Sequence, residues 1–276
     1  MAAALATSFR QSPASTSTTE SNVAARADLI CASPLFAGIP RYACEEFARH
    51  ARPKAFAREE MLFMQGQPVR NIALIRTGSV KITQLAPNGN EVILWMYGAG
   101  NVVGALSEQF PTLHNCSGRA MEPCTALVWE REVLQDLVAQ YPQVRNNISQ
   151  ILFSRLNELE ERFREVATEK VAKRTALALL RLLKHVGKQV HGGVEISLSR
   201  EELAQMTGTT LFTTSRILAH WGKMGYVLPR REAVLVRDAR QLALAEEDDS
   251  FDSGPLVARR KSVTGRLGHR AIECLA

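Results

Sequence analysis

The spacing of apolar positions changes twice along the chain. Between residues 60 and 129, short apolar runs are separated by turn residues, and Pro87-Asn-Gly89-Asn before Glu91-Val-Ile-Leu-Trp95 is typical of a β-hairpin. Short strands at this spacing predict a sandwich or a roll. From about Pro142 the period is helical, and residues 171–236 indicate further helices and two short strands. With 276 residues, 46% of them hydrophobic, the chain is long enough for two domains.

Residues 198–218 are typical of a helix-turn-helix. Ser199 is placed to cap the first helix, and Glu202 would complete a capping box. Gly208 stands where this helix must end with positive φ, and Thr210 can cap the second helix. The inward-facing positions are Leu203, Met206, Thr214, Ile217, Leu218 and Trp221. The outer residues of the second helix, predicted to enter a DNA major groove, are Leu211, Phe212, Thr213, Ser215 and Arg216.

Residues 225–236 follow as two short apolar strands around a charged turn, which predicts the wing of a winged helix. Arg230 and Arg231 in that turn can hold a phosphate. The predicted DNA-facing surface consists of these two residues, Ser199, Thr210 and the outer residues of the second helix. Residues 171–240 hold twelve Lys and Arg against five Asp and Glu, a local charge of +7 beside +6 for the whole chain. Positive charge is therefore concentrated where phosphates would be neutralised. The alternative interpretation is an ordinary αα-hairpin with a solvated Arg216.

Residues 152–166 carry a narrow apolar stripe at intervals of four, three, four and three. Its members, here called the dimer seam, are Leu152, Leu156, Leu159, Phe163 and Val166. Charged residues cover the other faces, which is typical of a coiled coil and predicts a homodimer. The alternative is a core-facing helix of a monomer, because the stripe spans barely two heptads.

The five cysteines, Cys31, Cys44, Cys116, Cys124 and Cys274, lie far apart and contain no Cys-x-x-Cys pair. This spacing favours neither a zinc site nor a disulfide framework, and we predict no metal site. Cys116 and Cys124 are near enough in sequence to share a sensing surface. The alternative is that each is a small buried apolar residue.

The two ends of the chain lack a core pattern. Residues 1–28 are rich in Ala, Ser and Thr and are predicted to be a disordered tail, with a transit peptide as the alternative. Residues 244–276 run from Glu246-Glu-Asp-Asp249 to Arg259-Arg-Lys261 and are predicted to be a flexible tail, with a DNA or polymerase contact as the alternative. No apolar run approaches the roughly 18 residues of a membrane span, so we expect a cytoplasmic protein without membrane contact.

Taken in chain order, these elements resemble the CRP/FNR family of bacterial transcription regulators over about residues 29–243. The most specific residues are Thr77-Gly-Ser-Val-Lys81, Gly100-Asn-Val-Val-Gly104, Arg119-Ala120 and the helix-turn-helix. The resemblance implies an α+β fold with an N-terminal double-stranded β-helix (jelly-roll) sensor domain, a long dimerisation helix and a C-terminal winged helix-turn-helix. It assigns the sensor domain to residues 29–142, the dimerisation helix to residues 143–170 and the winged helix-turn-helix to residues 171–243.

The resemblance also implies the partners and the action of the protein. A small-molecule or gas effector in the roll would change the position of the dimerisation helices of a homodimer. This change would reorient the recognition helices on double-stranded DNA. Binding near a promoter would then bring the protein into contact with RNA polymerase. Ser215 and Arg216 match the Ser-Arg pair that reads bases in the FNR-like branch. Phe212 stands where family members commonly have Glu, and Leu211 stands where cyclic-AMP receptors have Arg. Since a phenyl ring cannot accept from cytosine N4, we expect an altered operator.

The resemblance places an effector pocket at nine positions: Gly100, Val103, Gly104, Ala105, His114, Asn115, Arg119, Leu159 and Glu160. Ala105 stands where cyclic-AMP binders have Glu, and His114 and Asn115 stand where they have Arg and Ser. A buried phosphodiester would lack its guanidinium partner, so the sequence indicates an effector other than cyclic AMP.

The family that the chain resembles includes proteins that sense through an iron-sulfur cluster or a haem. An iron-sulfur cluster is not favoured, because only Cys31 and Cys44 precede the roll. A haem is the alternative cofactor, with His114 or Cys116 as the candidate axial ligand. The alternative function is a cyclic-nucleotide-binding regulatory module that acts through protein contacts. The chain contains no phosphate loop, nucleophile elbow or His-Glu-x-x-His motif, so we predict no enzymatic activity.

Overall fold

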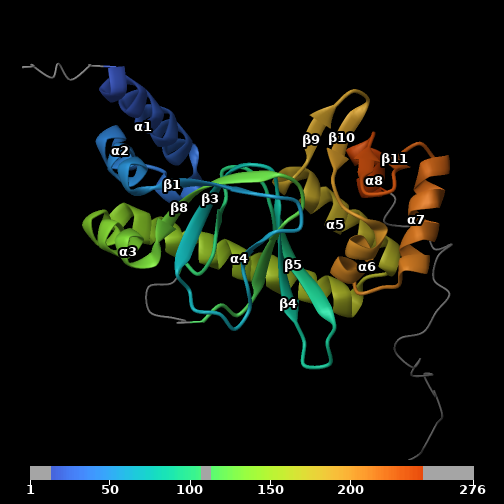
Figure 1. Ribbon diagram of the computed structural model, residues 1–276. Helices are drawn as coiled ribbons and strands as arrows, with labels where there is room; N and C mark the ends of the chain where they lie inside the picture. The colour runs from blue at the N-terminus through green and yellow to red at the C-terminus, as the bar shows by residue number, and fades with distance from the viewer. Residues whose placement is uncertain (1–13, 107–112, 245–276) are drawn as a thin grey trace, which may run out of the picture.

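The computed structural model describes residues 14–106 and 113–244. The N-terminal half is a roll of two four-stranded antiparallel sheets (Figure 1). One sheet has the order β1 (Arg52–Phe56), β8 (Cys124–Glu130), β3 (Asn71–Thr77), β6 (Val102–Val103). The other has the order β2 (Met61–Phe63), β7 (Ser117–Ala120), β4 (Val80–Leu85), β5 (Glu91–Tyr97). Alternate residues of both sheets, among them Ile75, Val80, Ile82 and Val103, form the roll's apolar core. The predicted α+β class and roll are confirmed.

Gly78 shows why a glycine is needed between β3 and β4. Its φ is +82°, and a Cβ atom there would lie 2.7 Å from the carbonyl oxygen of Pro123. Only glycine tolerates both the left-handed backbone and this close approach. The turn therefore joins the two sheets directly beside β8.

Four helical elements cover one end of the roll: α1 (Ala14–Ala32), the 3-10 helix η1 (Pro34–Phe36), α2 (Arg41–His50) and α3 (Arg131–Gln140). The prediction of a disordered tail up to residue 28 is wrong for α1. Val23, Ala27 and Ile30 fall at helical spacing and pack into the core beside Phe47 of α2. The Ala, Ser and Thr composition concealed this short stripe. Residues 1–13 lie outside the described part of the chain.

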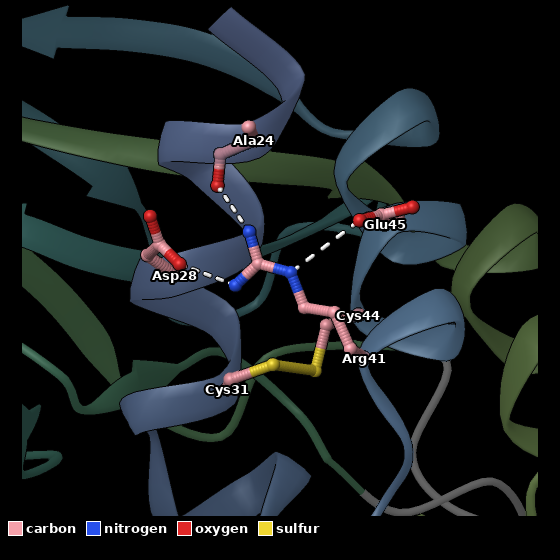
Figure 2. The surroundings of a disulfide bond; sticks show 6 residues. All are labelled: Ala24, Asp28, Cys31, Arg41, Cys44 and Glu45. Atoms are coloured by element: carbon pink, nitrogen blue, oxygen red, sulfur yellow. Dashed lines mark hydrogen bonds and ion pairs between the residues drawn. A yellow bond between two sulfur atoms is a disulfide. The ribbon is translucent and has the colours of Figure 1, made fainter. Parts of the chain in front are cut away.

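The predicted absence of a disulfide is also wrong, because Cys31 of α1 is bonded to Cys44 of α2 (Figure 2). The chain reverses at Gly38, where φ is +80°, so that α1 and α2 pack together. Their Cα atoms at the two cysteines are then 5.8 Å apart, within disulfide range. This pairing depends on a tertiary turn that cysteine spacing does not reveal.

The long helix α4 (Pro142–Thr168) runs along the roll from the α1–α3 end to the C-terminal domain (Figure 1). Pro142 stands at its first turn, where a missing N–H costs nothing. One face packs on the roll, where Arg162 donates to the carbonyl oxygens of Ile93 and Leu94. The helix ends at Thr168, close to the predicted boundary.

The C-terminal part is a compact arrangement of helices and a four-stranded sheet. Its elements are α5 (Val171–His185), β9 (Lys188–Val190), β10 (Gly193–Ile196), α6 (Arg200–Thr207), α7 (Leu211–Lys223), β11 (Val227–Pro229), β12 (Val234–Val236) and α8 (Ala239–Leu244). The sheet order is β11-β12-β10-β9, and Ile196 of this sheet is fully buried in one apolar core with Leu179 of α5 and Trp221 of α7. The predicted strands of the wing are β11 and β12, paired from Val227–Val236 to Pro229–Val234. The predicted flexible tail lies outside the described residues, apart from Leu244.

Candidate nucleic-acid interface

The turn between α6 and α7 has the local geometry that the sequence predicts. The Ser199 hydroxyl accepts from the Glu202 backbone N–H at 3.1 Å, and the Glu202 carboxylate accepts from the Ser199 N–H at 2.8 Å. Gly208 ends α6 with φ 62°, and the Thr210 hydroxyl accepts from the Thr213 N–H at 3.1 Å. The capping box, the glycine stop and the second cap are confirmed.

The recognition helix α7 divides cleanly into an inner and an outer face. All four predicted inward residues, Thr214, Ile217, Leu218 and Trp221, are fully buried. Leu211 and Phe212 at its N-terminal turn are 50% and 71% exposed. The Arg216 guanidinium lies 5.9 Å from the centre of the Phe212 ring, one turn away on the same face. Thr213 and Ser215 beside them are half-buried.

The wing and the two helix starts surround a surface hollow of about 480 Å³. Its lining includes four residues of the predicted DNA-facing surface: Ser199, Leu211, Arg230 and Arg231. Arg230 is paired with Glu195 of β10, so Arg231 is the more available cation of the turn. The remaining members, Thr210, Phe212, Thr213, Ser215 and Arg216, lie on α7 or at its cap outside this lining.

Arg200 also lines this hollow but was not predicted. Its Nε is buried and has no hydrogen-bond partner among the described residues. A phosphate oxygen is an acceptor that a guanidinium binds well. The only sequence signal was its position next to the cap residue Ser199.

An ion pair joins the roll to the helix-turn-helix. Lys81 of β4 and Glu202 of α6 are 2.7 Å apart, with side chains only 11% and 18% exposed. Because β4 alternates, Val80 and Ile82 face the roll core and Lys81 faces α6. Burial favours the neutral acid, but hydrogen bonds from Lys81 and Ser199 outweigh it and lower the pKa of Glu202. Sequence reasoning had missed both the pair and its place at the cap.

Further contacts connect the long helix to the DNA-binding domain. Glu165 of α4, almost fully buried, accepts two hydrogen bonds from Arg181 of α5 at 2.6 and 2.8 Å. Arg174 donates to the carbonyl oxygens of Glu169 and Thr207 at 3.1 Å each. The end of α4 is thus hydrogen-bonded, through one guanidinium, to the C-terminal end of α6.

The dimer seam of α4 is exposed in the single chain. Its five residues are between 40% and 76% exposed, with Phe163 the highest. Phe153, 64% exposed and not predicted, adds apolar surface beside Leu152. Contiguous exposed apolar side chains of this kind mark an interaction site.

The predicted effector residues are distributed over separate places, so the structure does not bring the nine together. Gly100 lines a cavity of about 160 Å³ between η1, β5, β6 and α4, whereas Ala105 lines a much smaller space beside α3. Val103 is buried in the roll core, and Gly104, with φ +112°, lies against Ile72. The interior of the roll is filled by apolar side chains rather than by a shared polar pocket.

The other predicted effector residues have protein partners or face outward. His114 stacks on the Phe63 ring at 4.4 Å, and the carbonyl of exposed Asn115 accepts from Gln84. The Arg119 guanidinium lies 3.3 Å from the Glu59 carboxylate. The last two, Leu159 and Glu160, are on the exposed part of α4.

Tyr97 and Arg155, two residues that the sequence did not indicate, line the cavity beside Gly100. The Tyr97 hydroxyl is buried without a hydrogen-bond partner among the described residues, and burial raises the pKa of Tyr97 to about 12. It therefore stays protonated and can donate. Arg155 places its guanidinium 4.7 Å from the centre of the Tyr97 ring and donates to the Val102 carbonyl at 2.9 Å. The site suits a small ligand that carries acceptor atoms.

The surroundings of His114 and Cys116 do not fit a haem. Neither residue lines any of the cavities described above, and Phe63 covers the His114 ring. Burial raises the pKa of the Cys116 thiol, although Arg155 opposes this, so the protonated form is favoured. Cys116 and Cys124 both belong to the apolar cluster of the roll, and Cys124 is buried.

Other observations narrow the class of protein. No helix in the described residues is both long and apolar enough to cross a membrane. A sensor-like roll, a long helix and a winged helix with an outward recognition helix together define a DNA-binding transcription regulator. Residues 53–141 match the cyclic nucleotide-binding domain family and residues 173–245 the Crp-like helix-turn-helix domain. The chain belongs to the CRP/FNR family of bacterial transcription regulators.

Curated relatives and solved structures agree with this assignment. The "CRP-like cAMP-activated global transcriptional regulator" of Mycobacterium tuberculosis is 26% identical over 218 residues, covering 78% of this chain and 97% of the relative. The "Cyclic AMP receptor protein" of Thermus thermophilus is 28% identical over 215 residues, covering 78% and 96%. FixK2 from Bradyrhizobium japonicum has the same fold, with a TM-score of 0.63 at 20% identity and coverage of 71% and 97%. The curated relatives are transcription regulators rather than enzymes.

Proposed function

We propose that this protein is a homodimer that binds a two-fold symmetric operator and regulates transcription in response to an effector in the N-terminal roll. The observation that carries the proposal is the outward face of α7, which presents Phe212 and Arg216, while Leu211 at its start shares a surface hollow with the wing residues Arg230 and Arg231. Apolar and guanidinium groups read base edges, while the wing cations bind phosphates. The exposed seam of α4 supports a two-fold dimer, which would present two such helices.

The effector in this proposal is not cyclic AMP. Ala105 provides no carboxylate for a ribose, the His114 ring packs on Phe63, and the Arg119 guanidinium is already paired with Glu59. A small ligand with acceptor atoms, bound beside Tyr97 and Arg155, would satisfy the Tyr97 hydroxyl. Contact with RNA polymerase would follow from binding next to a promoter.

The test is selection of an operator from random duplexes by the full chain, followed by affinity measurements at fixed salt. Arg216→Ala should lower the affinity for the selected operator about tenfold or more, because a bidentate guanine contact contributes roughly 1–3 kcal/mol in each half-site. Arg240→Ala removes the same charge from α8, outside the hollow, and should leave affinity nearly unchanged.

Three outcomes would contradict parts of the proposal. Unchanged operator affinity for Arg216→Ala would remove this residue from base reading. Equal affinity for selected and random duplexes would favour the alternative module that acts through protein contacts. Cyclic AMP, added to a parallel selection, should leave operator affinity unchanged, and a strong increase would show that the effector assignment is wrong.

A further inference from the structure

We propose that the Cys31–Cys44 disulfide is a thiol–disulfide exchange site, opened by a dithiol reductant, and that its opening weakens operator binding. The DNA-binding part of this inference rests on the function proposed above. The redox state of this bond between α1 and α2 can be measured without DNA, so it is tested separately from DNA binding.

The two sulfur atoms differ in how they can be approached. Cys31 is partly exposed near the end of α1, whereas Cys44 is fully buried in α2. An incoming thiolate can therefore reach the sulfur of Cys31 first. In a protein that acts on the chromosome, thiols are kept reduced, and disulfides there are usually transient or redox-sensing.

The packing of α1 on α2 does not depend on the disulfide alone. Arg41 pairs with Asp28 and donates to the Ala24 carbonyl at 3.1 Å, as Figure 2 shows. Arg26 donates to the Ala51 carbonyl at 3.0 Å, and Ala27 and Ile30 are buried against α2. We therefore expect both the oxidised and the reduced chain to be folded.

The exchange balances as a two-electron step. A thiolate of the dithiol attacks the Cys31 sulfur, the bond to Cys44 breaks, and Cys44 leaves as a thiolate that takes up a proton. The second thiol of the reductant then attacks the mixed disulfide and releases the Cys31 thiol. The protein gains two electrons and two protons, and the dithiol becomes a disulfide.

The loop closed by the disulfide contacts the long helix and the cavity. Ser33, just after α1, donates to the Gly100 carbonyl at 2.8 Å. The buried amide of Asn147 on α4 donates to the carbonyls of Leu35 and Ala37 at 2.9 Å each. Ser33, Leu35 and Gly100 all line the cavity beside Tyr97. The loop thus holds both the start of α4 and the segment that forms the proposed effector site.

Opening the bond gives residues 31–44 more conformational freedom. Closure of this loop restricts its backbone, so the acceptors of Asn147 and the Ser33 contact are better fixed in the oxidised form. A less fixed α4 would hold the two recognition helices less well in register. We expect reduction to weaken operator binding by roughly five- to a hundredfold, the usual range of coupling between sites.

The test uses the full chain equilibrated with reduced and oxidised dithiothreitol at a series of ratios. Alkylation and mass spectrometry should show Cys31 and Cys44 becoming thiols together, in one two-electron transition. Affinity for the selected operator should fall with the same midpoint, while the circular dichroism spectrum keeps its helical signal. The double variant Cys31→Ser with Cys44→Ser should bind the operator like the reduced protein at every ratio of reduced to oxidised dithiothreitol. Cys116→Ser, also at a partly exposed cysteine, should respond like the unmodified chain.

The outcomes separate this proposal from the proposed function. Absence of specific binding in both forms would overturn the proposed function, whereas equal specific binding in both forms would overturn the redox control. A bond that stays closed at every ratio, or a chain that unfolds on reduction, would show a purely structural disulfide and also overturn it.

Discussion

Phe212 is the residue at which this recognition helix departs most from the FNR-like pattern. The residue is 71% exposed at the first turn of α7 and is not part of the buried core. An exposed aromatic residue on a DNA-facing helix has an apolar edge that fits the methyl group of thymine. The ring also lies near the Arg216 guanidinium, and it can limit where that group points.

Phe212→Glu should change operator preference rather than abolish binding. A carboxylate can accept from cytosine N4, so we expect cytosine to replace thymine at one position of each half-site, with roughly 1–3 kcal/mol of discrimination. Repeating the selection with the variant measures this change. Phe212→Leu keeps an apolar side chain and should retain the original preference; an identical operator for the Glu variant would show that Phe212 does not contact a base.

Single residues whose role is local were predictable from the sequence. Ser199, Gly208 and Thr210 act through hydrogen bonds and backbone angles within three residues, so their types and spacing are sufficient evidence. Cys31 and Lys81 were not predictable, because each partner arrives through folding from another element. The same reason explains the effector residues: their positions in the chain were taken from the resemblance, while their neighbours depend on how the roll packs.

Helix α6 shows how one element serves two domains. Its capping residue Glu202 uses one carboxylate oxygen for the Ser199 N–H and the other for Lys81 of the roll. The start of the helix-turn-helix is therefore fixed by the sensor domain as well as by its own cap. Ile93, Met96 and Met121 of the roll complete the contact by joining the apolar core of the C-terminal domain.

Glu202→Gln should destabilise the protein in a pH-dependent manner. Glutamine can still accept from the Ser199 N–H, but Lys81 loses its anion, so we expect the free energy of unfolding at pH 7 to fall by roughly 1–3 kcal/mol. The folded-state pKa of Glu202 lies below its ordinary value of 4.5. The carboxylate therefore stabilises fully above that value, and its contribution is lost as pH falls through the folded-state pKa.

Urea unfolding of both chains between pH 8 and about pH 2 measures this difference, which should begin to narrow below about pH 4.5 and continue to narrow through the lower folded-state pKa. Glu201→Gln removes the same charge from the exposed side of the first turn and should have little effect. A difference that stays constant across the pH range would show that the ion pair does not contribute.

Elements with strong periodicity were predicted well, and those without it were missed. The helices of the helix-turn-helix and the β3 to β5 strands carry apolar residues at clear intervals. In β1 only Phe56 is buried, and all three residues of β9 are exposed, so neither strand has an apolar pattern to detect. Helix α1 was missed because its buried stripe is short and lies in a segment of polar composition.

Across the whole molecule, α4 is in contact with every part that the proposed regulation requires. Its start is held by the loop that the disulfide closes, its middle borders the Tyr97 cavity, and its end is hydrogen-bonded to the DNA-binding domain. Its remaining face carries the dimer seam. A shift of this helix would therefore change the distance between two recognition helices, which is the quantity that operator spacing measures.

Phe163→Asp should separate the dimer without unfolding the chain. The side chain is 76% exposed in one chain, so its replacement leaves the internal core intact, whereas a carboxylate in the seam would be buried without a partner on association. Sedimentation equilibrium should show the mass falling from twice 30.5 kDa to 30.5 kDa, with unchanged circular dichroism. Operator affinity should fall at least tenfold, because each half-site is then bound by an independent domain. Asn157→Asp adds a carboxylate to another exposed position of α4 and should remain dimeric. A Phe163→Asp chain that keeps the dimer mass would place the dimer contact elsewhere and refute the seam.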